Sequence, residues 1–260
     1  MLGRLGQLGN QMFQYAALFA IARRRGYGFC IPPAIAIDQY REQRLSQTFA
    51  LPGAATIAFH AGAPVVRPRS FAFDPELAHG CPDHVDLFGY FQSERWFEDE
   101  AAGVRAEFAF RPEILGPCQA AIAPLGPQVI GLHVRRGDFV VKSESFPPCG
   151  ADYYARALER MPAGLPVMVF SDDLDWCRAE PVFSGPRFTF SDGRSASHDL
   201  CLMSLCRHHV IANSSFSWWG AWLAGGEGQL VVAPQRWFGE TGHTAALDTR
   251  DLVPERWARV

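Results

Sequence analysis

The chain has 260 residues and a mass of 28.8 kDa, which is enough for one large domain or for two of ordinary size. Hydrophobic residues make up 48% of the chain and charged residues 20%, so a sizeable core is expected and wholesale disorder is excluded. The net charge is −3 and no block of five like charges occurs, which argues against binding to nucleic acid.

The first half of the chain predicts one long helix and little other regular structure. A helical apolar pattern runs over residues 10–21, and arginines followed by Gly26 are typical of a helix end. Residues 31–83 are rich in Pro, Gly and Ala, and their periodicity is weak. A short strand is expected at 85–88, and Ser93 is placed to cap a helix after it. Glycines precede the long helix at every third position: Gly3, Gly6 and Gly9.

From residue 127 onward, strands and helices alternate regularly. Strands are expected at 129–134, 167–170, 188–190, 210–212 and 230–232. Helices are expected at 153–160, 174–178, 197–206 and 215–223. This alternation predicts right-handed βαβ units around a buried parallel sheet. Because Pro and Gly are frequent at 116–127, we expect a hinge there between an N-terminal lobe, residues 1–125, and a C-terminal lobe, residues 126–260.

The strongest local motif is His133-Val134-Arg135-Arg136-Gly137-Asp138, at the end of an apolar strand. In a doubly wound sheet the carboxyl ends of the strands line the ligand crevice. Two guanidinium groups there would meet an anion such as a diphosphate. The alternative interpretation is an ion pair between Arg136 and Asp138 on a surface loop.

A second motif, Phe170-Ser171-Asp172-Asp173, also follows a strand. Asp172 and Asp173 could accept hydrogen bonds from ribose hydroxyls, order the arginines, or only cap the next helix. Asp173-Leu174-Asp175 also matches the D-x-D pattern by which many metal-dependent sugar transferases hold manganese. A three-letter pattern is a weak predictor of a metal site.

The third motif covers residues 211–222 and runs from a strand into a helix. Free N–H groups in the first helical turn, beside the hydroxyls of Ser214 and Ser215, form a seat for an anion. The alternative is a serine cap on a helix whose tryptophans pack in the core. The two interpretations are compatible, since serines and tryptophans occupy different positions of the helix.

Five stretches together resemble, in the same order along the chain, the bacterial α-1,2-fucosyltransferases of glycosyltransferase family 11. The stretches are LGNQMFQYA at 8–16, GYFQS at 89–93, HVRRGD at 133–138, FSDD at 170–173, and 202–204 together with NSSFSWWGAW at 213–222. The resemblance implies an α/β fold of the GT-B type, with two Rossmann-like lobes and the nucleotide-sugar site in the C-terminal lobe.

The resemblance also implies an inverting reaction with GDP-β-L-fucose as the donor and no cofactor or metal. Fucose would be transferred to a hydroxyl of a glycan acceptor, usually the 2-OH of a galactose-type residue. Phe139 differs from the tyrosine that the family generally has at this position. Most of the family's first strand is missing before the glycines, and residues 31–83, which should help to form the acceptor cleft, identify no acceptor.

Carried over position by position, the resemblance implies roles for single residues. The catalytic residues would be Arg135 at the donor diphosphate, Asn10 near the reacting sugars, and Asp138 as one candidate for a base. Asp199 stands 16 residues before Ser215, where related inverting fucosyltransferases place an aspartate that reads guanine; otherwise Asp199 only caps or charges its helix. The donor would be bound by His133, Arg135, Arg136, Asp172, Asp199, Ser214, Ser215 and Phe216.

Three other functions stay open on the sequence alone. Asp173 and Asp175 are compatible with a metal-dependent transferase, and a related enzyme could use another GDP-sugar. Arg136-Gly137-Asp138 is an adhesion tripeptide, which is compatible with a non-catalytic glycan-binding or adhesion protein. It directly follows an apolar strand, however, and adhesion requires a flexible exposed loop.

The cysteines and the hydropathy pattern predict the compartment. Seven cysteines, an odd number without a C-x-x-C pair, argue against a disulfide framework and a structural zinc site. No signal peptide and no apolar run long enough for a membrane span is present. We therefore expect a cytoplasmic protein with reduced thiols and no integral membrane segment; peripheral membrane association is compatible with the sequence.

Overall fold

The computed structural model of the chain describes residues 2, 5–32, 44–56 and 62–260, and it divides into two compact units. The first unit comprises Met1–Arg111 and Leu247–Pro254, and the second comprises Pro112–Ala246 and Glu255–Val260. Gly3 and parts of the irregular segment 31–83 lie outside the described residues.

The division between the units falls earlier than the expected boundary after residue 125. Helix α5 (Pro112–Ile122) belongs to the second unit because it packs along α9 (Ala196–Leu205). The chain also returns to the first unit near its end, where Asp251 accepts a hydrogen bond from the backbone N–H of Phe73 and pairs with Arg95 at 2.9 Å.

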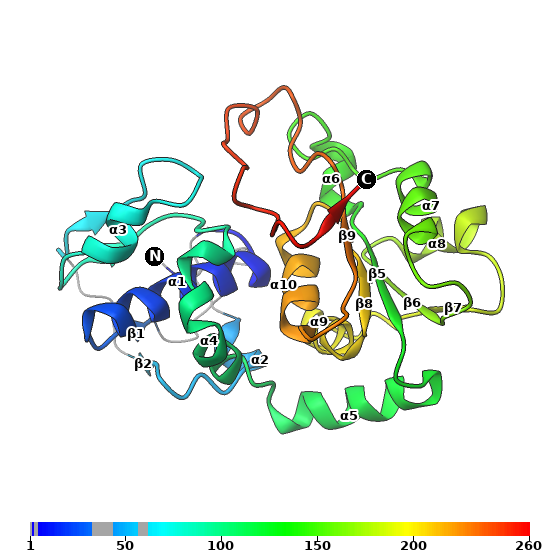
Figure 1. The fold of residues 1–260 in the computed structure, drawn as a ribbon, viewed down its shortest axis with the longest axis horizontal. Helices are drawn as coiled ribbons and strands as arrows, with labels where there is room; N and C mark the ends of the chain where they lie inside the picture. The colour runs from blue at the N-terminus through cyan, green and yellow to red at the C-terminus, as the bar shows by residue number, and fades with distance from the viewer. Residues whose placement is uncertain (1, 3–4, 33–43, 57–61) are drawn as a thin grey trace. The chain divides into compact units, whose positions relative to one another are not determined.

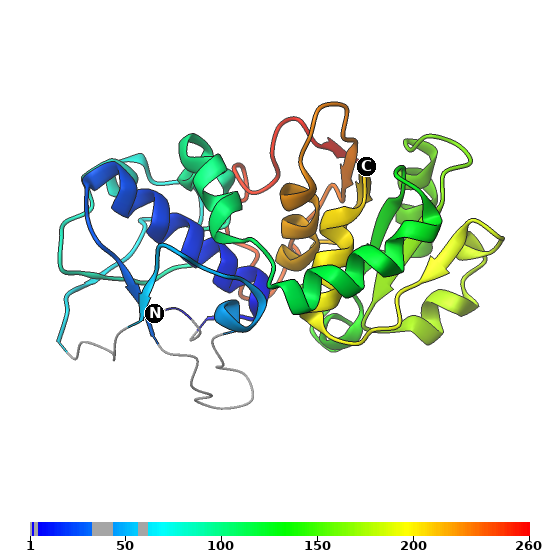
Figure 2. The same cartoon turned by 90° about the horizontal axis from the view of Figure 1, so that it is seen from below.

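The predicted long helix is present in the first unit as α1 (Leu8–Arg25) (Figure 2). Most of its residues are buried. It ends at Gly26, whose φ of 66° is left-handed and therefore favours glycine. The other helices of this unit are α2 (Leu45–Thr48), α3 (Pro75–Gly80) and α4 (Ala101–Glu107). The segment after Ser93 is a 3₁₀ turn, η1 (Glu94–Trp96), followed by η2 (Glu98–Glu100), and Ser93 caps η1 as expected.

The strands described in the first unit are short and parallel. β1 (Cys30–Ile31) pairs with β2 (Ala55–Thr56), and β3 (Val65–Val66) pairs with β4 (Asp86–Leu87), which lies within the predicted strand. Much of the core therefore consists of side chains packed on α1. Tyr15 of α1 contacts Phe108 and donates a hydrogen bond of 2.6 Å to the buried carboxylate of Glu107.

The second unit contains a six-stranded, fully parallel sheet in the order β10-β9-β8-β5-β6-β7. The sheet confirms the α/β fold class. Its strands are β5 (Ile130–Val134), β6 (Val167–Ser171), β7 (Phe188–Phe190), β8 (His208–Val210), β9 (Val231–Ala233) and β10 (Ala258–Arg259). Its helices, besides α5 and α9, are α6 (Gly137–Val141), α7 (Ala151–Glu159), α8 (Leu174–Ala179) and α10 (Ser215–Ala224), with 3₁₀ turns η3 (Ala123–Leu125) and η4 (Pro181–Phe183).

Two strands differ from the prediction. β8 begins two residues earlier than expected, because the buried histidines His208 and His209 belong to the strand although they interrupt its apolar pattern. Their ring nitrogens interact with the backbone: His208 Nδ1 accepts from the N–H of Leu230, and His209 Nε2 lies 2.8 Å from the carbonyl of Met203. β10 has no apolar run of its own and exists because it pairs with β9.

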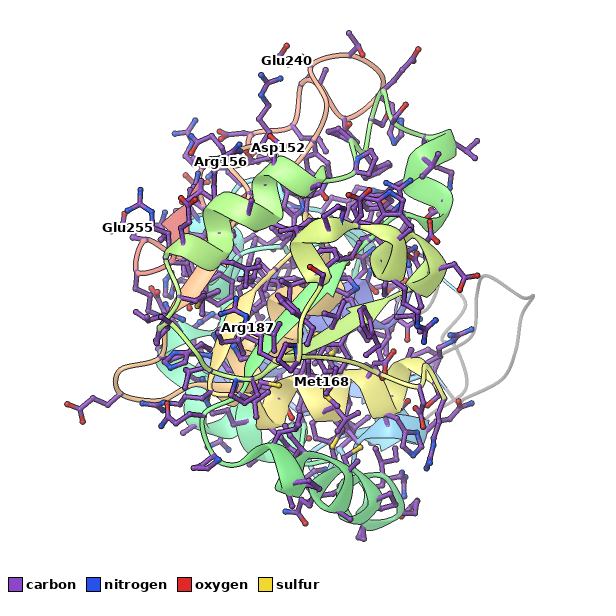
Figure 3. The ribbon with its side chains drawn as sticks, turned by 90° about the vertical axis from the view of Figure 1, so that its right-hand side faces the viewer. Asp152, Arg156, Met168, Arg187, Glu240 and Glu255 are labelled. Carbon is purple, nitrogen blue, oxygen red and sulfur yellow. The ribbon has the colours of Figure 1, made fainter. Side chains whose placement is uncertain are left out.

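Helices cover both faces of this sheet, as Figure 1 shows. α7 and α8 pack with β5 and β6 in one core cluster, whereas α9 and α10 lie together on the other face. The outer side of α7 carries the ion pair between Asp152 and Arg156, 2.9 Å apart (Figure 3).

The order of the strands reverses between β5 and β8. From β5 the chain proceeds to β6 and β7 on one side and then returns to β8, β9 and β10 on the other. In open α/β sheets, ligands bind outside the carboxyl ends of the strands at such a switch point. A ligand site of the second unit is therefore expected beyond the ends of β5 and β8.

The contact between α9 and α10 generates a prediction about stability. A Cβ atom on Gly220 of α10 would lie 2.7 Å from Cβ of Met203 in α9, so Gly220→Ala should lower the free energy of unfolding by about 1–3 kcal/mol through overpacking. Gly116→Ala on α5 is the matched control, because a Cβ there meets no atom within 4 Å and should stabilise the helix by about 0.5–1 kcal/mol. Urea denaturation measures both, and equal effects would contradict the close packing of the two helices.

Candidate active site

Arg135 directly follows β5, whose five residues are all buried. Its Nη2 lies 2.6 Å from Oδ1 of Asp138, and its Nη1 lies 2.8 Å from Oδ2 of Asp172. The guanidinium also lies 5.3 Å from the ring centroid of Phe139. The exposed fraction of the Arg135 side chain is 24%. Arg135 is thus fixed in orientation at the switch point while part of its guanidinium stays open to a ligand.

Arg136 has different partners. Its Nε lies 3.1 Å from Asp173, and its guanidinium lies 4.2 Å from the ring centroid of Trp176. The alternative pair of Arg136 with Asp138 is therefore wrong, because Asp138, in the first turn of α6, pairs with Arg135 and with Lys142 one helical turn further on. The adhesion tripeptide begins a helix with both its charged side chains engaged, which differs from a free loop.

Asp172 and Asp173 do more than cap a helix. Asp173 caps α8 by accepting from the N–H of Trp176 and also orders Arg136. Asp172 accepts from the backbone N–H of Arg136 at 2.9 Å and pairs with Arg135. A Cβ on Gly137 would lie 2.4 Å from Asp172 Oδ2, so glycine is required for this approach of the carboxylate.

Asp138 is a weak candidate for a base. Its partial burial raises the pKa of its carboxyl, but the nearby Arg135 and Lys142 outweigh this effect and hold the pKa below the ordinary value. A carboxylate with a lowered pKa binds a proton poorly. Its contacts indicate instead that Asp138 orients Arg135.

His133 lies on β5 beside the start of α10. Its ring centroid is 5.6 Å from that of Phe216, and its carbonyl accepts from the hydroxyl of Tyr154 at 3.2 Å. Burial, together with the charge of Arg135, lowers the pKa of His133 to about 3. Nδ1 is buried and has no hydrogen-bond partner in the described parts of the chain. His133 is therefore neutral at pH 7.

The start of α10 has the geometry of a helix cap. Ser214 caps the helix by accepting from the N–H of Phe216 at 3.3 Å, and Ser215 is the first helical residue. Both serines are half-buried, whereas the predicted core tryptophans, Trp218, Trp219 and Trp222, are buried. The first-turn N–H groups of α10 thus begin at the carboxyl end of β8, next to β5.

Asp199 does not cap α9. Ser195 does so, since its side chain accepts from the N–H of His198, and the interpretation of Asp199 as the cap is wrong. The carboxylate of Asp199 instead accepts a short hydrogen bond from Ser191, which directly follows β7. Burial raises the pKa of Asp199, and the Ser191 hydrogen bond offsets part of this effect. Asp199 therefore lies at the same edge of the sheet as Arg135 and the start of α10.

Asn10 lies in the other compact unit, in the first turn of α1. Its Oδ1 accepts a hydrogen bond of 2.6 Å from Nε2 of Gln92. The other residues expected at the site lie together at one edge of the second unit: Arg135, Arg136, Asp138, Asp172, Asp199, Ser214, Ser215, Phe216 and His133. The role expected for Asn10 stays a prediction.

The D-x-D carboxylates have other partners. Asp173 is engaged with α8 and Arg136, and Asp175 is fully exposed and lies 3.5 Å from Arg178. Over the described ranges, no group of three or more His, Cys, Asp and Glu side chains is arranged to hold a metal ion. The expectation that the reaction needs no metal stays a prediction.

Several residues of this edge escaped the sequence analysis. Trp176 stacks under Arg136, Ser191 hydrogen-bonds Asp199, and Asn213 donates to the carbonyls of Pro147 and Trp237, each at 3.0 Å. The position of Ser191 directly after a predicted strand could have indicated that it belongs to this edge of the sheet. Asn213 belongs to the third motif, but the sequence did not indicate its role, because its partners belong to loops distant in the sequence.

No described helix combines the length and the hydropathy that a membrane crossing requires. All seven cysteines, each of them among the described residues, are free thiols.

A parallel α/β unit with arginines and a helix start at its switch point is the arrangement of a protein that binds a phosphorylated ligand. Comparison with known proteins identifies the family: residues 73–249 match the model of glycosyl transferase family 11. This chain belongs to that family and is a glycosyltransferase.

Individual relatives agree with this assignment. An α-1,2-colitosyltransferase from Escherichia coli is 29% identical over 98% of this chain and 96% of its own length. The galactoside 2-alpha-L-fucosyltransferase Sec1 from Mus musculus is 30% identical over 85% of this chain, which spans 63% of that protein. The crystal structure of fucosyltransferase NodZ from Bradyrhizobium matches with a TM-score of 0.55 at 17% identity, over 82% of this chain and 88% of that one. NodZ is GT-B-like, and the GT-B fold class of this chain is thereby confirmed.

The buried histidine generates a prediction about pH. The unfolded chain protonates His133 below a pH of about 6.5, whereas the folded chain does so only near pH 3. Between these values the unfolded chain binds more protons, so His133 destabilises the fold as the pH falls, by about 2 kcal/mol at pH 5. His133→Gln should therefore lose less stability than the wild type when urea denaturation at pH 7 is compared with pH 5.

The control for this experiment is His84→Gln, because the side chain of His84 is 94% exposed. Equal losses of unfolding free energy in the wild type and in His133→Gln would show that His133 does not sustain a lowered pKa in the folded protein.

Proposed function

We propose that this glycosyltransferase transfers L-fucose from GDP-β-L-fucose, with inversion, to the 2-OH of a galactose-type residue of a glycan. The observation that carries the proposal is Arg135, held by two carboxylates at the switch point beside the start of α10. Both named relatives, an α-1,2-colitosyltransferase and a galactoside 2-alpha-L-fucosyltransferase, support the linkage, and the second also supports the sugar.

In this proposal, Arg135 and the N-terminus of α10 bind the diphosphate. As the bond to fucose breaks, negative charge develops on the leaving GDP. A guanidinium provides planar paired donors, and the first N–H groups of α10 add the positive end of a helix dipole. Because Asp138 and Asp172 already fix Arg135, little reorganisation is needed when this charge appears.

The rest of the carboxyl edge binds the nucleoside. Asp199 has one carboxylate oxygen engaged by Ser191 and keeps acceptor capacity for the N1–H and N2 amino group of guanine. Neutral His133 and Phe216 lie ring to ring at this edge. Arg136, held by Asp173 and Trp176, completes the cationic side of the site. Inversion in a single displacement requires the acceptor hydroxyl to lose its proton, and an oxocarbenium-like path needs little help from a base.

A second donor, GDP-colitose, is favoured by one observation: the colitosyltransferase aligns with 98% of this chain. Colitose is L-fucose without its 3-hydroxyl. A site that hydrogen-bonds this hydroxyl would reject the deoxy sugar by up to about 10⁴-fold, whereas an apolar site would not. The choice between the two sugars therefore depends on contacts to one hydroxyl.

The proposal is tested by incubation with GDP-fucose or GDP-colitose and an array of galactose-terminated glycans. We expect an α-1,2-fucosylated product and release of GDP, with turnover in excess EDTA within about twofold of that without it. A preference for GDP-colitose would change the sugar but not the reaction. Complete loss in EDTA with recovery in manganese would support the metal-dependent alternative through Asp173 and Asp175.

Arg135→Lys should fail almost as completely as Arg135→Ala. An ammonium group cannot reproduce a paired contact with a diphosphate, nor can it bridge Asp138 and Asp172 in the same way. Steady-state kinetics should show a loss of turnover of at least about a hundredfold, as for removal of one transition-state donor. Near-normal turnover of the lysine variant would show that Arg135 is only a local ion-pair partner.

Asp199→Asn should weaken GDP binding with little change in stability. The substitution keeps the shape of the side chain but turns one acceptor into a donor that faces a donor of guanine. Calorimetric titration should show a loss of about 1.5–3 kcal/mol for GDP, and a smaller loss for IDP, which lacks the N2 amino group. Unaltered GDP affinity would refute the guanine assignment. Ser195→Ala, which removes the actual cap of α9, is the control for helix effects.

A further inference from the structure

The guanidinium of Arg135 has a third contact besides its two carboxylates. Its Cζ lies over the ring of Phe139, 5.3 Å from the centroid, and the face of an aromatic ring attracts a cation. Asp138 and Asp172 hold the two terminal nitrogens, so the plane of the group could still tilt about the line through these atoms. The ring of Phe139 opposes this tilt, because tilting would carry the guanidinium away from the ring or against it.

Phe139 is itself held by a series of ring contacts within the second unit. It stacks on Phe146, with 5.2 Å between the centroids and 28° between the planes, and both rings are half-buried. Phe146 in turn packs edge-on with Phe238 at 5.7 Å and with His243 at 5.8 Å. Such arrangements are the preferred geometries of aromatic pairs. Ring contacts therefore run without a break from the loop that follows β9, residues 234–246, to Arg135.

This loop is anchored directly beside Phe146, at Ser145, which is 7% exposed. The carbonyl of Ser145 accepts from the N–H of Gly239 at 3.0 Å and from the hydroxyl of Thr244 at 2.9 Å. Its Oγ lies 3.1 Å from Nδ1 of His243. A Cβ on Gly239 would lie 1.8 Å from the carbonyl oxygen of Glu144, so the backbones pack closely here. The loop and the segment after α6 thus form one packed layer.

We propose that Phe146 is a positioning residue, which holds the Arg135 guanidinium through Phe139 in the orientation that binds the donor diphosphate. A paired contact with a phosphate requires the planar fork to face it, and a tilted guanidinium would offer one donor in place of two. The loop after β9 thereby takes part in forming the diphosphate site. The inference rests on the proposed function, because it takes the role of Arg135 at the diphosphate as given.

Phe146→Leu tests the proposal, because it removes the ring and keeps an apolar side chain. We expect calorimetric titration to show a dissociation constant of GDP raised about three- to tenfold, as for the loss of one cation–π contact of a partly exposed arginine. The value of kcat/KM for the GDP-sugar should fall at least as far, since the charge on the diphosphate increases in the transition state. Phe146→Tyr keeps the ring, and its GDP affinity should stay within about twofold of the wild type.

A double-mutant cycle shows whether Phe146 acts through Arg135. In an Arg135→Ala background, Phe146→Leu should change the dissociation constant of GDP less than about twofold, because no guanidinium is left to position. A Phe146 that contacts the nucleotide itself, or that only supports the fold, would cause the same loss in both backgrounds.

Phe188→Leu is the matched control for the loss of a half-buried ring. Phe188 also lies under an arginine, with Cζ of Arg187 5.0 Å from its centroid, but at the amino end of β7. Its replacement should lower the melting temperature and leave the dissociation constant of GDP at the wild-type value. Phe139→Leu is a second test that holds even if Phe146→Leu does not fold, because it removes the ring next to Arg135 and should weaken GDP binding by the same factor.

The outcomes distinguish this proposal from the function on which it rests. Unaltered GDP affinity in Phe146→Leu or Phe139→Leu, or equal losses in the two backgrounds of the cycle, would refute the positioning role and leave the proposed function intact. Failure of the wild type to bind GDP or to transfer a sugar from a GDP donor would refute the proposed function itself, and with it the role of Phe146.

Discussion

The site depends on the fixing of one guanidinium between two carboxylates. Asp138 and Asp172 approach Arg135 from α6 and from the end of β6. Each contact alone would be a partly exposed ion pair of modest strength. Together they hold a long side chain in one orientation, so the entropy of ordering it is lost on folding and not on ligand binding. Gly137 is part of this constraint, because a side chain there would displace Asp172.

The parallel sheet determines where this arginine lies. Strand order reverses between β5 and β8, so the segments after these neighbouring strands leave toward opposite faces. Arg135 and the serines of α10 thus reach one edge from two directions. The buried tryptophans of α10 and the contact of Gly220 with Met203 hold this helix close to α9. A cationic side chain and a helix dipole reinforce each other here without clustering of like charges.

The same device recurs in the first unit on a smaller scale. Gln92 occupies one end of the Asn10 amide, just as Asp138 and Asp172 occupy parts of Arg135. In each case a hydrogen-bonded partner fixes the orientation of a polar side chain. Preorganised donors of this type stabilise developing charge more effectively than flexible ones, because they do not have to reorient during the reaction.

The sequence by itself determined the features that local patterns encode. The end of α1 at Gly26, the start of α10 at Ser215, the alternation of strands and helices after residue 127, and the place of Arg135 at a strand end all follow from apolar periodicity and capping residues. The family also followed from the sequence, because its motifs lie in order along the chain.

Only the tertiary structure decided which side chains meet. It excluded the alternative Arg136–Asp138 pair and paired Arg135 with Asp138 and Asp172, gave the cap of α9 to Ser195, placed α5 in the second unit and added β10 to the sheet. Some of these contacts join residues that are distant in the sequence, as Arg135 and Asp172 are. In others, several nearby carboxylates compete for the same partner. Their outcome depends on strand order and helix direction, because local propensity contains no information about either.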